Sequence, residues 1–188
     1  MPNWCLNMLT RKDDGNIAEI VNPYLVESDN GFGFDFDFNK IIPVPEDLKL
    51  EASFGTNDED LKSKYKSNME KYGFANWYDF CVAKWGTKWN GSCGSFDENK
   101  TMFSFDTAWS PPVHIVKKLA EMSGQVLILE YIEEGNFFCG RLTVSPDGEQ
   151  DEYYNSIEDA PQELLDKLGY EPYEEENDLL IQTEKTQN

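Results

Sequence analysis

The stretch TMFSFDTAWSPPVHIVKKLAEMSGQVLILEYIEEG, residues 101–135, decides the fold. Its first part, TMFSFDTAW, alternates large with small or polar residues, which is the period of a strand with one buried face. A helix follows, in which Ser110 is expected to cap the N-terminus, Pro111 to take the first helical position and Gly124 to end it. The apolar run QVLILEYIEEG then predicts a central strand. Together these features predict a strand–helix–strand unit.

A second unit of the same order precedes it in the chain. Residues 3–11 read as a strand, and apolar residues at helical spacing over 17–25 predict a helix. Pro23 interrupts that helix, so it either kinks it or, with Asn22 as a cap, starts a second turn. GFGFDFDFNKII, residues 31–42, alternates Phe with Gly or Asp and predicts a strand. Two such halves around an antiparallel sheet predict an α+β, ferredoxin-like fold with two packed helices on one face.

Residues 46–100 are predicted to be a helical insertion in this unit. Residues 56–59 have capping-box spacing and begin a first helix, which Gly73 is expected to end. Asn76 is expected to cap a second helix that ends at Gly86. The segment NGSCGSFDENK that follows is rich in Gly, Ser and Asn and predicts a loop.

The sequence predicts one domain over residues 1–170, followed by an acidic tail. Asp159 is expected to cap a last helix that ends at Gly169. Residues 171–188 have the composition of a flexible segment. One face of the sheet is expected to carry the two helices, and the other to stay open unless the insertion or the C-terminal helix covers it.

The charge of the chain is strongly negative and uneven. The net charge is −20, and residues 147–188 hold 14 acidic and 2 basic residues against 22 and 14 in residues 1–146. This balance argues against direct nucleic-acid binding, which needs basic residues, and permits a partner with a basic surface. It also fits a surface that only keeps the protein in solution, or carboxylates that mimic nucleic acid. No apolar run approaches the ~20 residues of a membrane span, and the N-terminus does not resemble a secretory signal, so a cytoplasmic location is expected.

Neither metal binding nor a cofactor is predicted. The spacing of the four cysteines, Cys5, Cys81, Cys93 and Cys139, matches no zinc pattern, and free thiols are expected, several of them buried. His114 is the only histidine, and its helical neighbours are lysines, so we expect it on an exposed polar face.

Five blocks of sequence resemble the YubB-type ferredoxin-like domain proteins of conjugative plasmids and bacteriophages. The resemblance spans about residues 1–145, and the blocks are MPNWCLN (1–7), KIIPVPEDL (40–48), WGTKWN (85–90), FDTAWSPP (105–112) and EYIEEGNFFCG (130–140). Arg11, where an apolar strand residue is usual, departs from the pattern, as does the pair Ala83–Lys84. The resemblance implies the fold and an accessory gene of a mobile element. That family has no established activity, so the resemblance supplies no catalytic residues.

The blocks share an unusual set of side chains that forms the candidate ligand-binding site. The set is Trp85, Lys88, Trp89, Thr107, Trp109, Tyr131 and Glu133. In one interpretation the tryptophans plug the gap between sheet and insertion, and Lys88 and Glu133 pair to hold the insertion. In the other, the rings wall a pocket for a nucleotide-like molecule. The sequence leaves both open.

Three functions follow from these observations as expectations. The first is a non-catalytic accessory protein of a phage or plasmid that binds a host protein, for instance to counter a defence system, in the host cytoplasm. The second is a protein that binds or sequesters a small nucleotide-like ligand. The third is an enzyme of unknown reaction, for which Pro2, exposed by removal of Met1, would offer an N-terminal amine as a base.

Overall fold

The computed structural model describes residues 3–170, except for residues 30, 32, 54, 134, 136 and 137. The strands are β1 (Trp4–Arg11), β2 (Leu25–Glu27), β3 (Phe34–Phe36), β4 (Gly91–Phe96), β5 (Met102–Ala108), β6 (Leu127–Glu133), β7 (Phe138–Ser145) and β8 (Gly148–Tyr154). The α-helices are α1 (Ala18–Val21), α2 (Glu59–Tyr72), α3 (Trp77–Trp85), α4 (Val113–Ser123) and α5 (Gln162–Lys167). Short 3₁₀ turns are η1 (Asn22–Tyr24), η2 (Phe38–Lys40), η3 (Glu46–Leu48) and η4 (Ile157–Asp159).

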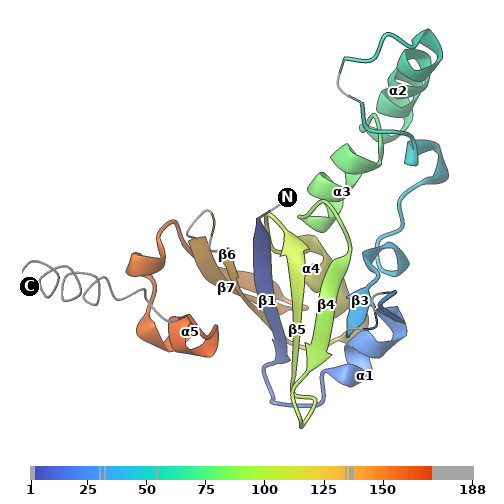
Figure 1. The fold of residues 1–188 in the computed structure, drawn as a ribbon. Helices are drawn as coiled ribbons and strands as arrows, with labels where there is room; N and C mark the ends of the chain where they lie inside the picture. Colours follow the sequence, from blue (N-terminus) through green and yellow to red (C-terminus); the bar gives the residue numbers. More distant parts are fainter. Residues whose placement is uncertain are drawn as a thin grey trace, which may run out of the picture.

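The strands form one antiparallel sheet in the order β2-β3-β4-β5-β1-β6-β7-β8 (Figure 1). β1 lies in its middle, where Asn7 is opposite Phe105 of β5 on one side and Tyr131 of β6 on the other. The four central strands, β4-β5-β1-β6, have the strand order of a ferredoxin-like sheet. The predicted fold class is therefore confirmed, with the sheet extended by two strands at each side.

The prediction of a loop after α3 is wrong, because this segment forms β4. Glycine has low strand propensity, but here the phenylalanine rings of neighbouring strands need the room. A Cβ on Gly94 would lie 2.7 Å from Cζ of Phe103, and one on Gly91 would lie 2.9 Å from Cδ2 of Phe105. The pairing is irregular between Ser92 and Ser95. The glycines and serines thus serve packing in a bulged strand rather than a turn.

The larger core lies between the sheet and α4. Leu9 of β1 and Leu129 of β6 are fully buried there, against Ile115 and Leu119 of α4. Phe36 of β3 meets the rings of neighbouring residues edge to face, the preferred geometry of aromatic pairs.

The short α1 packs into the same core. Pro23 lies in η1, so of the two predicted outcomes the chain takes a separate turn rather than a kinked helix.

The second face of the sheet carries α5. Ile132 and Cys139 pack with Leu164, Leu165 and Leu168 in a smaller core. Beside it Glu130, which is 1% exposed, binds Arg141 of β7 at 2.8 Å and Lys167 of α5 at 3.0 Å. The C-terminal helix therefore covers part of the face that the sequence left open. The helix has no side-chain cap: Asp159 lies in η4, and Pro161 precedes the first helical turn.

Helices α2 and α3 form an arm, residues 46–85, that projects from the sheet (Figure 1). The helix α2 ends at Gly73 and α3 begins at Asn76, as predicted. The prediction of a capping box at residues 56–59 is wrong, because the side chain of Asp58, and not that of Thr56, accepts the first free N–H groups of α2. The side chain of Asn68 fixes the arm by donating to the carbonyls of Asp47 and Ala75. The range 46–100, predicted as an insertion, therefore contains two different parts. The arm projects from the sheet, whereas β4 is one of the strands of the sheet.

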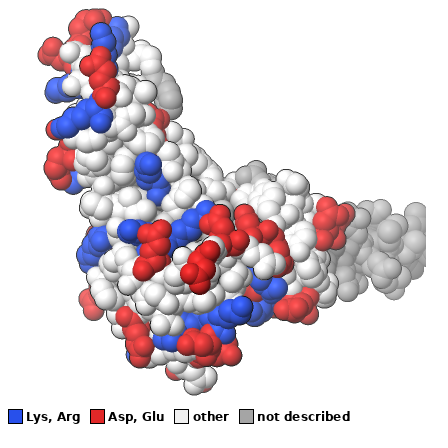
Figure 2. Space-filling view, turned by 180° about the vertical axis from the view of Figure 1, so that it is seen from behind, with Lys and Arg blue, Asp and Glu red and all other residues white. Residues whose placement is uncertain are grey.

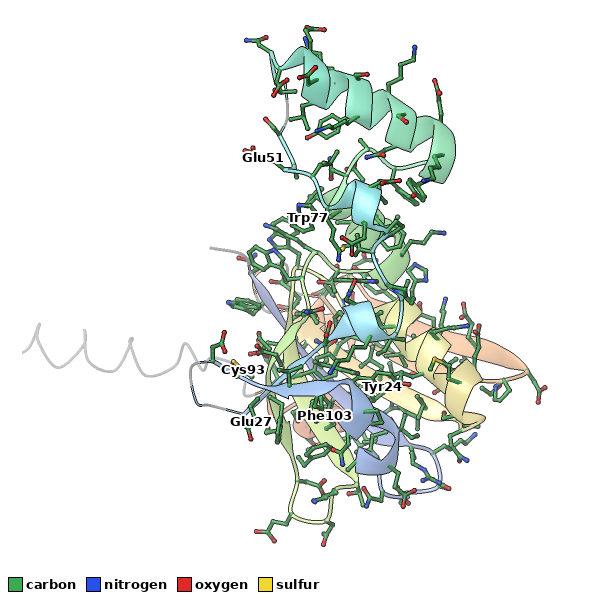
Figure 3. The ribbon with its side chains drawn as sticks, turned by 90° about the vertical axis from the view of Figure 1, so that its right-hand side faces the viewer. Tyr24, Glu27, Glu51, Trp77, Cys93 and Phe103 are labelled. Carbon is green, nitrogen blue, oxygen red and sulfur yellow. The ribbon has the colours of Figure 1, made fainter. Side chains whose placement is uncertain are left out.

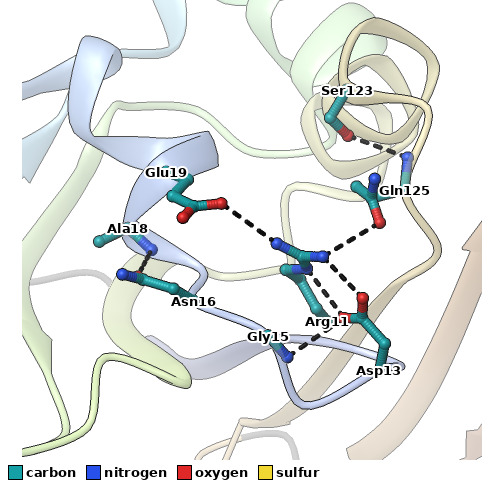
Figure 4. A network of polar contacts seen from close by, with 8 residues as sticks. All are labelled: Arg11, Asp13, Gly15, Asn16, Ala18, Glu19, Ser123 and Gln125. Carbon is teal, nitrogen blue, oxygen red and sulfur yellow. Dashed lines mark hydrogen bonds and ion pairs between the residues drawn. The ribbon is translucent and has the colours of Figure 1, made fainter.

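Arg11, at the end of β1, holds a network of polar contacts (Figure 4). Its guanidinium binds Asp13 at 2.6 Å and Glu19 of α1 at 3.4 Å, and donates to Gln125 at 3.3 Å. The departure from an apolar residue here therefore ties the end of β1 to α1 and to the segment before β6. Arg11 and the N–H of Gly15 both bind the Asp13 carboxylate, which lowers the pKa of that group.

The arm and the rear of the body carry basic and acidic side chains interspersed (Figure 2). Within the arm, Lys62 pairs with Glu59 and Lys71 with Asp47. None of the helices in the described ranges has the length and apolar character needed to cross a bilayer.

Candidate functional site

A cluster of exposed aromatic rings lies where the arm meets the sheet. We call Trp4, Tyr78, Lys88, Trp89 and Trp109 the aromatic cluster. Trp4 is 45% exposed, and Trp89 and Trp109 are each 38% exposed. The rings of Trp4 and Trp89 have centroids 6.4 Å apart, and those of Tyr78 and Trp109 are 6.5 Å apart. The cluster joins the start of β1, the end of β5 and α3.

Lys88 links the two halves of this cluster. Its Nζ lies 3.9 Å from the centroid of the Trp89 ring and 4.6 Å from that of Trp109. Such contacts are cation–π interactions, worth about 0.5–1 kcal/mol when exposed. Lys88 forms no ion pair with any residue that the structure describes, Glu133 included. The ammonium group thus carries its charge to the surface between two indoles.

The motif WGTKWN holds the arm to the sheet. Helix α3 ends at Gly86, whose φ of 91° is left-handed, and a Cβ there would lie 2.9 Å from the carbonyl oxygen of Pro111. Thr87 donates to the carbonyl of Ala108 at 2.8 Å, and Ser110 donates to that of Gly86 at 2.6 Å. The prediction that Ser110 caps α4 is therefore wrong. Its hydroxyl binds this motif instead, and Pro112 precedes the helix.

Trp109 has a backbone conformation that large residues avoid. Its φ is 70°, in the left-handed region, and its N–H donates to the carbonyl of Asn3 at 2.9 Å. Thr107 supports the turn by donating to the carbonyl of Ser110. A strained backbone that presents a large exposed ring is a pointer to function rather than to packing.

A pocket of about 240 Å³ opens beside the cluster, at the base of the arm. Trp77 and Cys81 of α3, with Trp85 and Val44, form its apolar walls. Nε1 of Trp85 donates to the carbonyl of Ile42 at 2.8 Å, which fixes the indole against the 39–49 segment. Figure 3 places Trp77 at the junction of arm and body. Burial raises the pKa of the Cys81 thiol to about 12, so it is a neutral, apolar wall at pH 7.

The polar rim of the pocket is made of amides and lysines. Lys49 and Lys88 lie there with Asn39 and Asn90. Oδ1 of Asn39 accepts from the N–H of Val44 at 2.8 Å, and Oδ1 of Asn90 accepts from that of Phe38 at 3.0 Å. Lys49 also pairs with Glu46. The rim therefore offers donors rather than acceptors to anything that enters.

The seven residues predicted as a ligand site separate into two groups. Trp85, Lys88 and Trp89 line the pocket, and Trp109 meets Lys88 outside it. The other three, Thr107, Tyr131 and Glu133, are at most 2% exposed. They lie in the core on the α4 face, where the Thr107 hydroxyl accepts from Asn7 at 2.9 Å. Burial also raises the pKa of Tyr131.

Sequence reasoning missed six of the residues that line the pocket, namely Asn39, Val44, Lys49, Trp77, Cys81 and Asn90. The block KIIPVPEDL contained a signal, because it recurs in the resemblance although it is neither a regular helix nor a strand. Trp77 and Cys81 are four positions apart in α3, which is the spacing of residues on one face of a helix. The sequence did not predict that the segment 39–49 and α3 lie against each other.

The other sequence candidates lie away from this site. His114 is exposed on α4, as predicted, and desolvation and the charges of Lys117 and Lys84 lower its pKa. The cysteines are free thiols, and of these only Cys93 is exposed. Pro2 and the tail, residues 171–188, lie outside the described residues.

Comparison with known proteins places the chain in a family. No curated protein matches it. The crystal structure of a protein api92 from Yersinia pseudotuberculosis is similar over 82% of this chain and 98% of that one, with 10% sequence identity and a TM-score of 0.43. The model of the ferredoxin-like domain in Api92-like proteins matches residues 84–179, just over half of the chain. The protein therefore belongs to the family that carries the ferredoxin-like domain of Api92-like proteins.

Proposed function

We propose that this protein is a non-catalytic accessory protein, encoded by a plasmid or phage, that binds a host protein in the host cytoplasm. The resemblance to YubB-type proteins motivates the genetic setting. The observation that carries the proposal is the aromatic cluster. Exposed Trp and Tyr rings are enriched at protein interfaces and at the residues that dominate their binding energy.

The backbone of Trp109 supports the same proposal. A left-handed conformation at a tryptophan costs free energy, and here it holds the ring at 38% exposure beside Lys88. A ring needed only for the core would be buried. The net charge of −20 favours a partner whose binding surface is basic, since complementary potentials speed association.

The experiment compares what the full chain retains from a bacterial host lysate with what matched variants retain. Trp4→Ala and Trp109→Ala each remove one ring from the aromatic cluster. Met122→Ala, which removes a 53% exposed side chain from α4, is the control. We expect the wild type and the control to retain one stoichiometric partner that both tryptophan variants lose, with retention weakened by salt. Equal retention by all four proteins, or no stoichiometric partner at all, would contradict the proposal.

A second candidate function, binding of a small ligand, is favoured by the pocket at the base of the arm. The pocket shares Lys88 and Trp89 with the aromatic cluster, but Trp77 and Trp85 belong to the pocket alone, and Trp4 and Trp109 belong to the cluster alone, so the two functions can be told apart through these residues.

A further inference from the structure

The charge of the pocket rim runs against the charge of the chain. The protein has 36 acidic and 16 basic residues, yet the described residues that line this pocket include two lysines and no carboxylate. Both lysines, Lys49 and Lys88, belong to its rim. In a protein this acidic, two lysines at one pocket favour the binding of an anion there.

The hydrogen-bonding groups at the rim agree with the charge. The side-chain oxygens of Asn39 and Asn90 are occupied by backbone N–H groups. The amide nitrogen of Asn90 donates to the Asp37 carboxylate at 3.5 Å, whereas that of Asn39 makes no bond within the described part of the chain and remains as a donor. Lysine offers donors only. An entering molecule must therefore present acceptors at this rim.

The walls set the shape of the ligand. Three indoles and the neutral thiol of Cys81 make the interior apolar, and indole faces favour flat rings. The volume of about 240 Å³ is below the ~300–1,000 Å³ of pockets for drug-sized ligands. One flat ring system fits this description, and a large or branched molecule does not.

We infer that the pocket binds a small planar aromatic anion, with its ring against the indole walls and its negative group against the ammonium of Lys88. The inference rests on the second candidate function and names its ligand class. Lys88 is suited to this role because its present contacts are the faces of Trp89 and Trp109 rather than a carboxylate. Among the described residues, therefore, Lys88 has no ion pair that an incoming anion would have to break. Lys49, which pairs with the exposed Glu46, contributes less.

The test is calorimetric titration with two pairs of probes that share a ring and differ in charge. The pairs are indole-3-acetate with indole-3-acetamide, and adenosine 5′-monophosphate with adenosine. We expect at least one anion to bind about tenfold or more tightly than its neutral counterpart. Lys88→Met should lower the affinity for the anion about tenfold and leave that for the neutral probe unchanged. Lys88→Arg should restore anion binding.

Two controls separate the outcomes. Lys66→Met removes the same charge from α2, away from the pocket, and should leave both affinities unchanged. In ¹H–¹⁵N spectra the indole N–H signals of Trp77 and Trp85 should move on titration, while that of Trp4 should not.

Equal binding of the charged and neutral probes would overturn the anion inference and leave the small-ligand function standing. Binding of no probe at millimolar concentration, or movement of the Trp4 signal instead, would overturn both. Neither result bears on capture of a host protein by the aromatic cluster.

Discussion

Two tryptophans of the motif WGTKWN, four positions apart in sequence, have different physical roles. Trp85 is 5% exposed and uses its Nε1 to bind the carbonyl of Ile42, whereas Trp89 is 38% exposed and meets Lys88 and Trp4. The motif therefore answers both interpretations that the sequence left open. One ring locks the 39–49 segment to α3, and the other belongs to the surface.

Replacement of Trp85 by phenylalanine tests the structural half of this division. The variant loses the bond to the Ile42 carbonyl, which is partly buried, and we expect a loss of about 1 kcal/mol in the free energy of unfolding. Urea denaturation followed by circular dichroism measures it. Trp4→Phe, at an exposed position, is the control and should change stability by less than about 0.5 kcal/mol. Equal losses in the two variants would contradict the assignment.

Arg11 and Asp13 predict a pH dependence at the corner of β1. The hydrogen bond from Arg11 lowers the pKa of Asp13 from its ordinary 3.8, so the fold favours the ionised carboxylate. This stabilisation is present above the ordinary pKa and is lost as pH falls through the lowered one. Asp13→Asn should therefore lower the melting temperature at pH 7, and the difference from wild type should shrink as the pH falls below the ordinary pKa of 3.8. A constant Asp13→Asn difference across pH would refute the linkage.

At the scale of elements, α5 shows how a short helix is held on a sheet. With six residues, Gln162–Lys167, it is too short to be stable alone, since isolated helices need about 12–15 residues. Its leucines and the binding of Lys167 to the buried Glu130 supply the stability instead. Arg141 binds the same carboxylate and also reaches Glu163 of α5. The buried acid is thus shared between sheet and helix.

Glu130→Ala should destabilise the protein by about 2 kcal/mol, because it removes the charge-assisted bonds to Arg141 and Lys167. It should also raise hydrogen exchange in α5 more than in α4, which has its own core. Urea denaturation and exchange mass spectrometry measure the two effects. Glu158→Ala, an exposed acid in η4, is the matched control. If α4 and α5 lost protection equally, Glu130 would support the whole domain rather than this helix.

At the scale of the whole molecule, the decisive feature is the place of β1. The family match begins at residue 84 and so does not include β1, although β1 lies between β5 and β6. Each of those strands therefore takes one full ladder of hydrogen bonds from the first residues of the chain. The matched segment is a unit of sequence, whereas the sheet is a unit only with β1.

The fragment 84–179 should consequently fail to fold alone. Both β5 and β6 would expose an unpaired, apolar inner edge, which favours aggregation over a native sheet. We expect poor dispersion in its ¹H–¹⁵N spectrum and no cooperative thermal transition, in contrast to the full chain. A cooperative transition in the fragment would mean that β5 and β6 can pair directly, and would contradict the central role of β1.

The sequence by itself determined the features that depend on neighbours in the chain. The alternating Phe103 and Phe105 predicted β5, the apolar run predicted β6, and Gly73, Gly86 and Gly124 ended their helices as expected. These signals are local, because strand alternation and helix termination involve residues within one or two turns of each other. They indicated the ferredoxin-like fold, although they did not predict β4, one of its four central strands.

The tertiary structure alone decided the features that depend on distant segments. Gly91 and Gly94 predict a loop by their own propensity, and only the rings of Phe103 and Phe105 packed against them make β4 a strand. The pocket brings Val44 to Trp77, from segments that no spacing rule connects. Tyr131 and Glu133 have the spacing of residues on one face of a strand. That spacing does not tell which face of the sheet α4 covers. Period fixes which residues share a face, and only packing fixes what that face meets.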